Sequence, residues 1–141
     1  MFLSEHPLII CDSQNIASKF VIHATHFPDD IAIVEDGTCV TYGWLLRHAH
    51  ALAVHLRSEH QPGAVVAIHG RRNVDTPLAM IACLLANITF VVIDAAYVQQ
   101  RILDILMLSG ARTLLHAELG EELRRAIAAS GISACPIRRG S

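Results

Sequence analysis

The sequence predicts an α/β fold in three layers, a mostly parallel sheet flanked by helices, with an N-terminal β-hairpin. From residue 64 onward, short runs rich in β-branched residues alternate with helix-like segments. That alternation is typical of βαβ units and a parallel sheet with helices on both faces. Asp36-Gly37 lies between the β-prone runs 31–34 and 38–41 and predicts a tight hairpin turn. The remaining elements follow from hydrophobic spacing and capping residues.

Two helices are expected around the hairpin. The first spans 14–26, and its apolar residues lie near one face. The second runs from Tyr42 to Glu59, with Thr41 as a candidate N-cap. Its inward face repeats at helical spacing, through Leu45, Ala49, Leu52 and Leu56.

Beyond the hairpin, the helices and strands alternate. The expected strands are 64–69, 89–93, 113–116 and 132–137, and the expected helices are 74–86, 98–109 and 118–130. We expect Asn73 or Thr76 to cap the helix at 74–86. Asn87 tolerates the left-handed conformation and can end that helix, and Gly110 and Gly131 are expected to end the next two.

An uncharged apolar stretch covers residues 76–93 and is long enough to consider as a membrane span. Pro77 opens the stretch, Asn87 interrupts it, and β-branched residues crowd its second half. This pattern favours a buried helix followed by a buried strand, and we therefore expect no membrane association.

The 141 residues are expected to form one domain, with a lead-in over 1–13, an α/β core over 14–137 and a tail over 138–141. The net charge is -2 and only 17% of residues are charged, with no basic stripe, which argues against a nucleic-acid partner. The N-terminus lacks the pattern of a secretory signal. The cysteines are widely spaced without a C-x-x-C pair, which indicates thiols in a reducing compartment, the cytoplasm. They are Cys11, Cys39, Cys83 and Cys135.

Two segments resemble the earliest motifs of the adenylation domains of non-ribosomal peptide synthetases, which are adenylate-forming enzymes. They are VTYGWL at residues 40–45 and LLANITFVVIDAAYVQQRI at residues 84–102. The family has T-Y-x-E-L at the first, and L-K-A-G-x-A-Y-V-P-(I/L)-D-P-x-Y-P-x-x-R-(I/L) at the second. The resemblance extends from about Ile16 to Leu115 and implies the fold of the first subdomain of these enzymes. In the family the ATP-binding loop, the substrate pocket and the catalytic lysine follow this region.

The second motif departs from the family at special positions. Leu85 replaces the lysine, Asn87 and Ile88 replace glycines, and prolines are absent. The proline positions hold Val92, Ala95 and Val98. Each change removes a backbone restraint or a tight turn, while the core periodicity remains. We interpret this as a truncated adenylation-like domain kept for its fold and freed from catalysis.

The segment Gly70-Arg71-Arg72-Asn73 lies where a strand meets a helix N-terminus, a place where backbone N–H groups can bind an anion. A single glycine does not make a G-x-G-x-x-G or phosphate-loop motif. We favour a solvated connection with surface arginines over a nucleotide site.

Histidines are frequent, with nine in the chain, and raise the question of a metal site. His23 and His26 lie one helical turn apart, and His48 and His55 lie seven apart on the next helix. Two histidines are only a partial zinc site. Because His48, His50 and His55 lie off the apolar stripe, we expect all three to be solvated. No metal is predicted.

Other polar residues are also interpreted as structural. Cys83 lies in an apolar helix and is expected to pack as a small hydrophobe, and no sequence pattern places a cysteine beside a histidine in the fold. Asp94 and Arg101 match the family motif, where this segment is scaffold. We expect Asp94 to begin a turn and Arg101 to pair with an acid such as Asp104. The sequence thus predicts no catalytic, cofactor-binding or metal-binding residue.

The resemblance leaves four interpretations of function. The leading one is a non-catalytic module of non-ribosomal peptide or hybrid polyketide biosynthesis that binds a synthetase, a carrier protein or a tailoring enzyme. The module is expected to bind its partner through an exposed apolar surface of the sheet or a helix, or to form a homodimer through that surface. The alternative is one half of a split amino-acid-adenylating enzyme, whose partner chain supplies ATP and substrate binding. An excised synthetase fragment and a small nucleotide binder using the Gly70–Asn73 turn are the others.

Overall fold

The computed structural model describes residues 13–61 and 63–137, and the lead-in and tail predicted from the sequence lie mostly outside these ranges. Five helices and six strands occur in the described residues. The helices are α2 (Ser13–His26), α3 (Tyr42–Glu59), α4 (Asp75–Ala86), α5 (Gln99–Ser109) and α6 (Glu121–Ala129). The strands are β1 (Ile31–Glu35), β2 (Thr38–Thr41), β3 (Val65–Gly70), β4 (Thr89–Asp94), β5 (Thr113–His116) and β6 (Ser133–Pro136).

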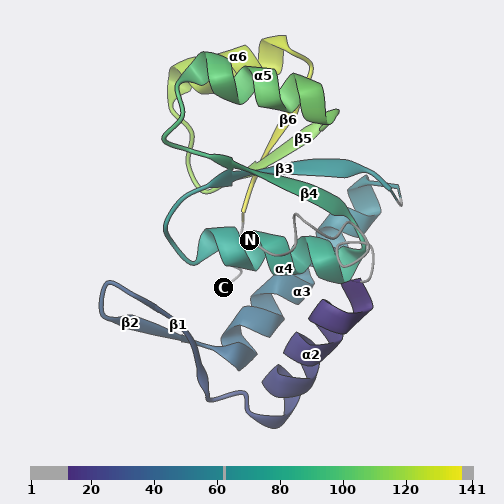
Figure 1. Cartoon of the computed structure of the whole chain (residues 1–141), viewed down its shortest axis with the longest axis vertical. Helices are drawn as coiled ribbons and strands as arrows, with labels where there is room; N and C mark the ends of the chain where they lie inside the picture. Colours follow the sequence, from purple (N-terminus) through teal and green to yellow (C-terminus); the bar gives the residue numbers. More distant parts are fainter. Residues whose placement is uncertain (1–12, 62, 138–141) are drawn as a thin grey trace.

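The three layers predicted from the sequence are confirmed (Figure 1). The central sheet has the order β4-β3-β5-β6, and all of its pairings are parallel. Helices α3 and α4 lie on one face and helices α5 and α6 on the other. Side chains of β3 alternate between two hydrophobic clusters, because Ile68 joins the cluster of α3 and α4 while Ala67 joins that of α5 and α6.

The hairpin β1-β2 forms a separate antiparallel pair at the α3 side of the molecule (Figure 1). Glu35 pairs with Thr38, so the turn has two residues, as the Asp-Gly dipeptide predicts. Asp36 and Gly37 both have positive φ angles, of 48° and 81°. The carboxylate of Glu35 reaches across to α4, where its Oε1 accepts a hydrogen bond of 2.6 Å from the Val74 backbone N–H.

Several helix ends follow the predictions. The Thr41 hydroxyl accepts a hydrogen bond from the Trp44 N–H at 3.1 Å and caps α3. Asn87 has a left-handed conformation at the end of α4, and Gly110 has one at the end of α5. The helix predicted from Glu118 begins later, at Glu121, because Gly120 is still extended. Glu118 therefore lies in the connection between β5 and α6.

Of the two residues predicted to cap α4, Asn73 bonds to the first N–H of the helix and Thr76 does not. The N-cap residue of α4 is Val74, whose side chain makes no capping hydrogen bond. Asn73 accepts from the Asp75 N–H through its side chain, and the Thr76 hydroxyl bonds to the backbone of Arg71 instead. The backbone donor of Val74 is satisfied by Glu35, which is distant in sequence and therefore invisible to a local pattern.

The apolar stretch at 76–93 forms the helix α4 and the strand β4, as predicted. Helix α4 is largely buried, but β4 lies at an edge of the described sheet and is only partly covered. The expectation of a buried strand is therefore wrong for most of β4, and Val92 is 42% exposed. No helix in the described ranges is both long and apolar enough to cross a membrane.

Replacing Gly70 with alanine is expected to destabilise the protein by about 1–3 kcal/mol, the usual cost of overpacking. A Cβ atom there would lie 2.7 Å from Val92 Cγ1 and 3.4 Å from the Ile93 carbonyl oxygen. Urea unfolding measures the change. In a Val92→Ala background the penalty should shrink, because the nearest clashing atom is gone; an equal penalty in both backgrounds would contradict the proposed clash.

Candidate functional site

The carboxyl ends of the parallel strands form the first candidate site. The strand after β3 in sequence, β4, lies on one side of β3, and β5 lies on the other. The order in which successive strands are added to the sheet therefore reverses at β3. Ligands of α/β sheets bind at the carboxyl ends of the strands where this order reverses. An open cavity of about 630 Å³ lies beside this position. Its lining includes Gly70, Arg71, Arg72, Thr76, Asp94 and Tyr97.

The loop after β3 is held by its own hydrogen bonds. The Thr76 hydroxyl accepts from the Arg71 N–H at 2.9 Å and donates to the Arg71 carbonyl at 2.8 Å. The Arg71 guanidinium donates to the carbonyl of Glu118 at 3.3 Å and so links the loops that follow β3 and β5. Arg71 therefore makes structural contacts, consistent with the preferred interpretation of this segment as a connection.

Two protein carboxylates already occupy the N-terminal end of α4. Glu35 accepts from the Val74 N–H, and Asp75 is a buried acid in the first turn. Both place negative charge where the helix dipole favours an anion. An incoming phosphate would meet this charge, so the geometry at this helix end does not favour a nucleotide.

Asp94 and Arg101 both make structural contacts. The contact of Asp94 was predicted, whereas that of Arg101 was not. Asp94 Oδ1 accepts a hydrogen bond of 2.8 Å from the Ala96 N–H, so it does begin a turn after β4. Arg101 lies over the Tyr97 ring, with its guanidinium carbon 4.3 Å from the ring centroid. The expected pairing with Asp104 is absent from the ion pairs of the described residues, and Asp104 accepts from Gln100 instead.

Sequence reasoning missed two buried histidines at this end of the sheet. His69 ends the buried part of β3, and His116 is the last residue of β5. Their side chains are 4% and 3% exposed. His69 Nδ1 and both ring nitrogens of His116 make no hydrogen bond within the described part of the chain. Their only sequence signal is a position directly after an apolar strand run.

The surroundings of both histidines favour the neutral form of the imidazole. Burial lowers the pKa of His69, and Arg71 and His116 lower it further against the opposing effect of Asp94. Burial also lowers the pKa of His116, assisted by the charge of Arg124. Neutral imidazoles at this position can accept or donate a hydrogen bond but add no positive charge to the site.

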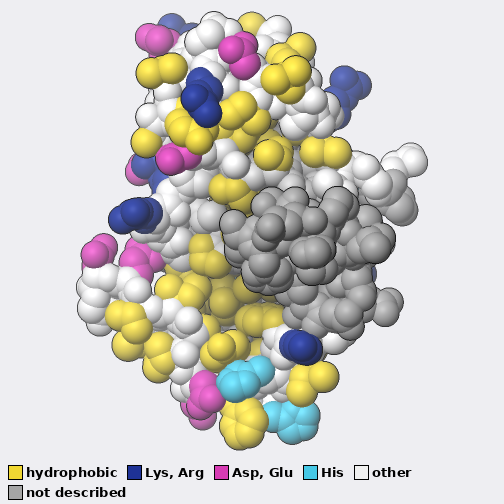
Figure 2. All heavy atoms as spheres, in the orientation of Figure 1, with side chains coloured by type: hydrophobic (Ala, Val, Ile, Leu, Met, Phe, Trp, Pro, Cys, Tyr) yellow, Lys and Arg dark blue, Asp and Glu magenta, His cyan; other side chains and the backbone are white. Residues whose placement is uncertain are grey.

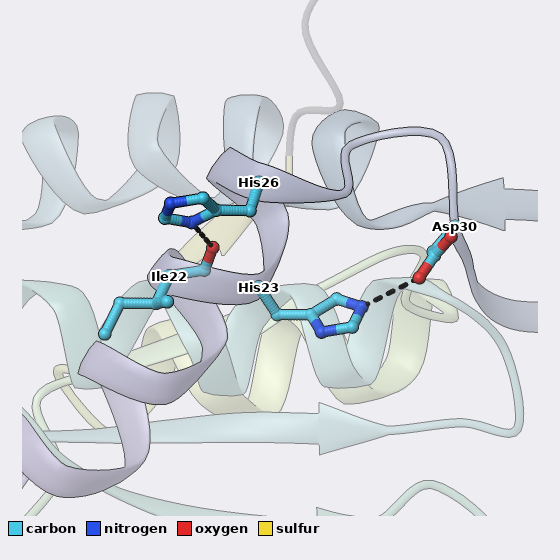
Figure 3. Close-up of polar contacts among 4 residues, drawn as sticks. All are labelled: Ile22, His23, His26 and Asp30. Carbon is cyan, nitrogen blue, oxygen red and sulfur yellow. Dashed lines mark hydrogen bonds and ion pairs between the residues drawn. The ribbon is translucent and has the colours of Figure 1, made fainter.

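The other histidines do not converge. His23 Nε2 lies 3.1 Å from Asp30 Oδ2, whereas His26 Nδ1 lies 2.9 Å from the Ile22 carbonyl. The two rings point away from each other, so they do not share a ligand position (Figure 3). Among residues 13–61 and 63–137, no group of three or more potential ligands is arranged to hold a metal ion.

One histidine prediction is wrong. His48 is buried, at 8% exposure, and its ring lies 4.1 Å from the ring of Trp44. Trp44 precedes it by one helical turn and packs against the core, which widens the buried stripe of α3 beyond its leucines and alanines. His50 and His55 are exposed, as predicted.

The cysteines differ in their surroundings. Cys83 is fully buried, and burial raises the pKa of its thiol to about 12, which confirms its interpretation as a packing residue. Cys39 is exposed in the hairpin, and Cys11 lies outside the described residues. Cys135, on β6, has its Sγ 3.9 Å from Nε2 of His55 on α3, a neighbour that the sequence did not reveal.

Large hydrophobic side chains are exposed at several places. Figure 2 shows hydrophobic side chains gathered between the hairpin and helix α4. Val34 of the hairpin is 66% exposed, and at the end of α5 Met107 is 65% and Leu108 is 88% exposed. Exposed side chains of this size are typical of surfaces that contact another protein when they are contiguous.

Several proteins of known identity are similar to this chain in sequence. Chondramide synthase cmdD of Chondromyces crocatus is 35% identical over 111 residues, which are 76% of this chain and 3% of that protein. Gramicidin S synthase 2 of Brevibacillus brevis is 36% identical over 104 residues, 73% of this chain and 2% of that protein. Tyrocidine synthase 1 of Brevibacillus parabrevis is 29% identical over 131 residues, 92% of this chain and 12% of that protein. The chain thus spans a small part of these relatives.

Solved structures share the fold. The nonribosomal peptide synthetase FmoA3 aligns with a TM-score of 0.75 and 27% identity over 86% of this chain and 13% of that one. The N-terminal subdomain of Klebsiella oxytoca NpsA, in complex with 3-hydroxybenzoyl-AMSN, aligns with a TM-score of 0.72 and 23% identity over 87% of this chain and 30% of that one. Residues 20–137 match the sequence profile of AMP-binding enzymes. The chain therefore belongs to the AMP-binding enzyme family and corresponds to the N-terminal part of a non-ribosomal peptide synthetase adenylation domain.

Proposed function

We propose that this chain is a non-catalytic, protein-binding module of non-ribosomal peptide or hybrid polyketide biosynthesis, acting in the cytoplasm. In this proposal the chain retains the scaffold of the first adenylation subdomain and contributes no catalytic group. Its partner is a synthetase, a carrier protein or a tailoring enzyme, or a second copy of the chain.

The hydrogen bonds of the polar residues at the carboxyl end of the sheet give the most direct support for the absence of catalysis. The Arg71 guanidinium joins two loops, and Asp94 closes a turn. Glu35 neutralises the N-terminus of α4 with a charge-assisted hydrogen bond. These residues stabilise the scaffold, and none of these contacts leaves a group aimed at a reacting atom.

The exposed hydrophobic side chains support a protein partner. Met107 and Leu108 lie together at the end of α5, and Val34 lies on the hairpin. A partner that covered these side chains would remove their apolar surface from water. This burial would stabilise the complex by about 25 cal/mol per Å² of apolar area. Strand β4 also lies at an edge of the described sheet, where a partner strand can pair with it.

A split enzyme is the second candidate, because related proteins bind adenylates with longer chains. FmoA3 has been solved with α-methyl-L-serine-AMP bound, and this chain covers 14% of that protein. In a split enzyme, a partner chain would supply the ATP loop, the substrate pocket and the catalytic lysine. Adenylation would then need both chains.

Amino-acid-dependent ATP–pyrophosphate exchange separates the two candidates. The purified chain alone should exchange no label above background with any proteinogenic amino acid. Exchange by the chain alone would overturn the non-catalytic proposal. The chain should next be co-expressed, tagged, with the proteins encoded beside it, and the bound protein identified by mass spectrometry and light scattering.

The outcome of co-purification decides between the candidates. A stoichiometric complex that shows no exchange supports the binding module, and a complex that gains exchange supports the split enzyme. A chain that remains monomeric would contradict both. A Met107→Ser/Leu108→Ser double variant is compared with Val54→Ser, a control at an exposed valine of α3, and it should bind the partner more weakly than this control.

A further inference from the structure

The structure places a nucleophile and a base together at a second cavity, between α3 and β6. Cys135 Sγ lies 3.9 Å from His55 Nε2, although 80 positions separate the two residues in the chain. The sulfur also lies 3.8 Å from the carbonyl oxygen of Pro136, which accepts a hydrogen bond from the thiol. Strand β6 is at the edge of the described sheet, and side-chain alternation turns Cys135 toward the layer of α3 and α4. The cavity has a volume of about 600 Å³.

The lining of this cavity suits a reactive thiol. His55 and Glu59 lie one helical turn apart on α3, and Cys135 faces them from β6. Among the described residues that line the cavity, these are the only titratable side chains. An imidazole next to a thiol takes its proton and stabilises the thiolate, and a nearby carboxylate favours the resulting imidazolium. Cys135 is partly exposed, so a small molecule can reach it.

We propose that Cys135 is a modification site, at which a thiolate activated by His55 undergoes exchange with a low-molecular-weight disulfide. His55 accepts the thiol proton, and the Cys135 thiolate attacks one sulfur of the disulfide. A new S–S bond forms to Cys135 while the original S–S bond breaks. Its electron pair leaves on the second sulfur, which takes a proton, and the protein retains a mixed disulfide.

The test uses the 141-residue chain and follows each cysteine by peptide mass spectrometry. Cystamine is the disulfide probe, and iodoacetamide measures the thiolate through the dependence of the alkylation rate on pH. We expect cystamine to add one cysteamine at Cys135, which dithiothreitol removes. The alkylation rate of Cys135 should reach its plateau at lower pH than in a His55→Gln variant, and at pH 7 Cys135 in this variant should react about threefold more slowly than in wild type.

Three controls keep the test specific. His50→Gln changes an exposed histidine on the same helix and should leave the pH profile of Cys135 unchanged. The rate at Cys39, exposed in the hairpin, should be the same in all variants. Circular dichroism should show equal folding, and Glu59→Gln supplies a second, conservative change in the cavity. An unchanged Cys135 profile in His55→Gln, or a Cys135 that reacts only in denaturant, would overturn the proposal.

Discussion

Replacing Glu35 with alanine is expected to lower the free energy of unfolding by about 1.5–3 kcal/mol, the range for a hydrogen bond to a charged group. The bond from the Val74 N–H to Glu35 Oε1 is 2.6 Å long, and Val74 is 2% exposed. Without the carboxylate, a largely buried backbone donor at the start of α4 loses its partner. The same substitution removes a negative charge from the positive end of the helix dipole.

Two variants and a local probe test this account. Glu35→Gln retains an acceptor oxygen but not the charge, so it should cost less than Glu35→Ala. Asp29→Ala removes an exposed acid in the turn before the hairpin and should change stability by no more than about 0.5 kcal/mol. Urea unfolding gives the free energies, and hydrogen exchange at the Val74 amide should accelerate in Glu35→Ala. Equal stabilities of Glu35→Ala and Asp29→Ala would contradict the cap.

The elements that were predicted correctly depend on local rules. The Asp36-Gly37 turn, the Thr41 cap and the left-handed Asn87 each follow from the preference of a single residue or dipeptide. The alternation of strands and helices likewise required only periodicity within each segment. These rules act over a few residues, and they placed every strand and helix close to its observed bounds.

Two contacts that the sequence did not predict have a different cause. Glu35 and Val74 are 39 positions apart, and His55 and Cys135 are 80 apart. Their contacts exist because the hairpin packs beside α3 and reaches the start of α4, and because β6 passes α3. A local sequence pattern does not predict where two elements meet. His48 shows the same limitation on a smaller scale, since the position of Trp44 against the core decides that His48 is buried.

Acid should destabilise this protein below pH 6.5 through His69 and His116. Unfolding returns both side chains to an ordinary pKa of 6.5, while in the folded protein burial lowers the pKa of each below that value. Below pH 6.5 the unfolded chain therefore binds more protons than the folded chain. Stability is fully present above pH 6.5 and is lost as the pH falls, by up to about 1.4 kcal/mol per pH unit for each histidine.

His69 and His116 lie next to each other at the ends of two paired strands, and a substitution of His116 tests the prediction. Ile68 pairs with Leu115, so His69 and His116 follow as the next neighbours on the face covered by α5 and α6. Leucine at position 116 would fill a similar space, remove two buried ring nitrogens without hydrogen-bond partners and eliminate one titration. His116→Leu should therefore lose about half of the wild-type pH dependence, and it should be the more stable of the two proteins at pH 5.

Unfolding by urea at several pH values from 5 to 8 measures this dependence. His50→Gln is the matched control, because it removes an exposed histidine of α3. Equal slopes in wild type and His116→Leu would contradict the prediction, because they would show that His116 binds protons alike in the folded and unfolded states. A halved slope would mean that both buried imidazoles contribute to the loss of stability in acid, because burial favours their neutral form.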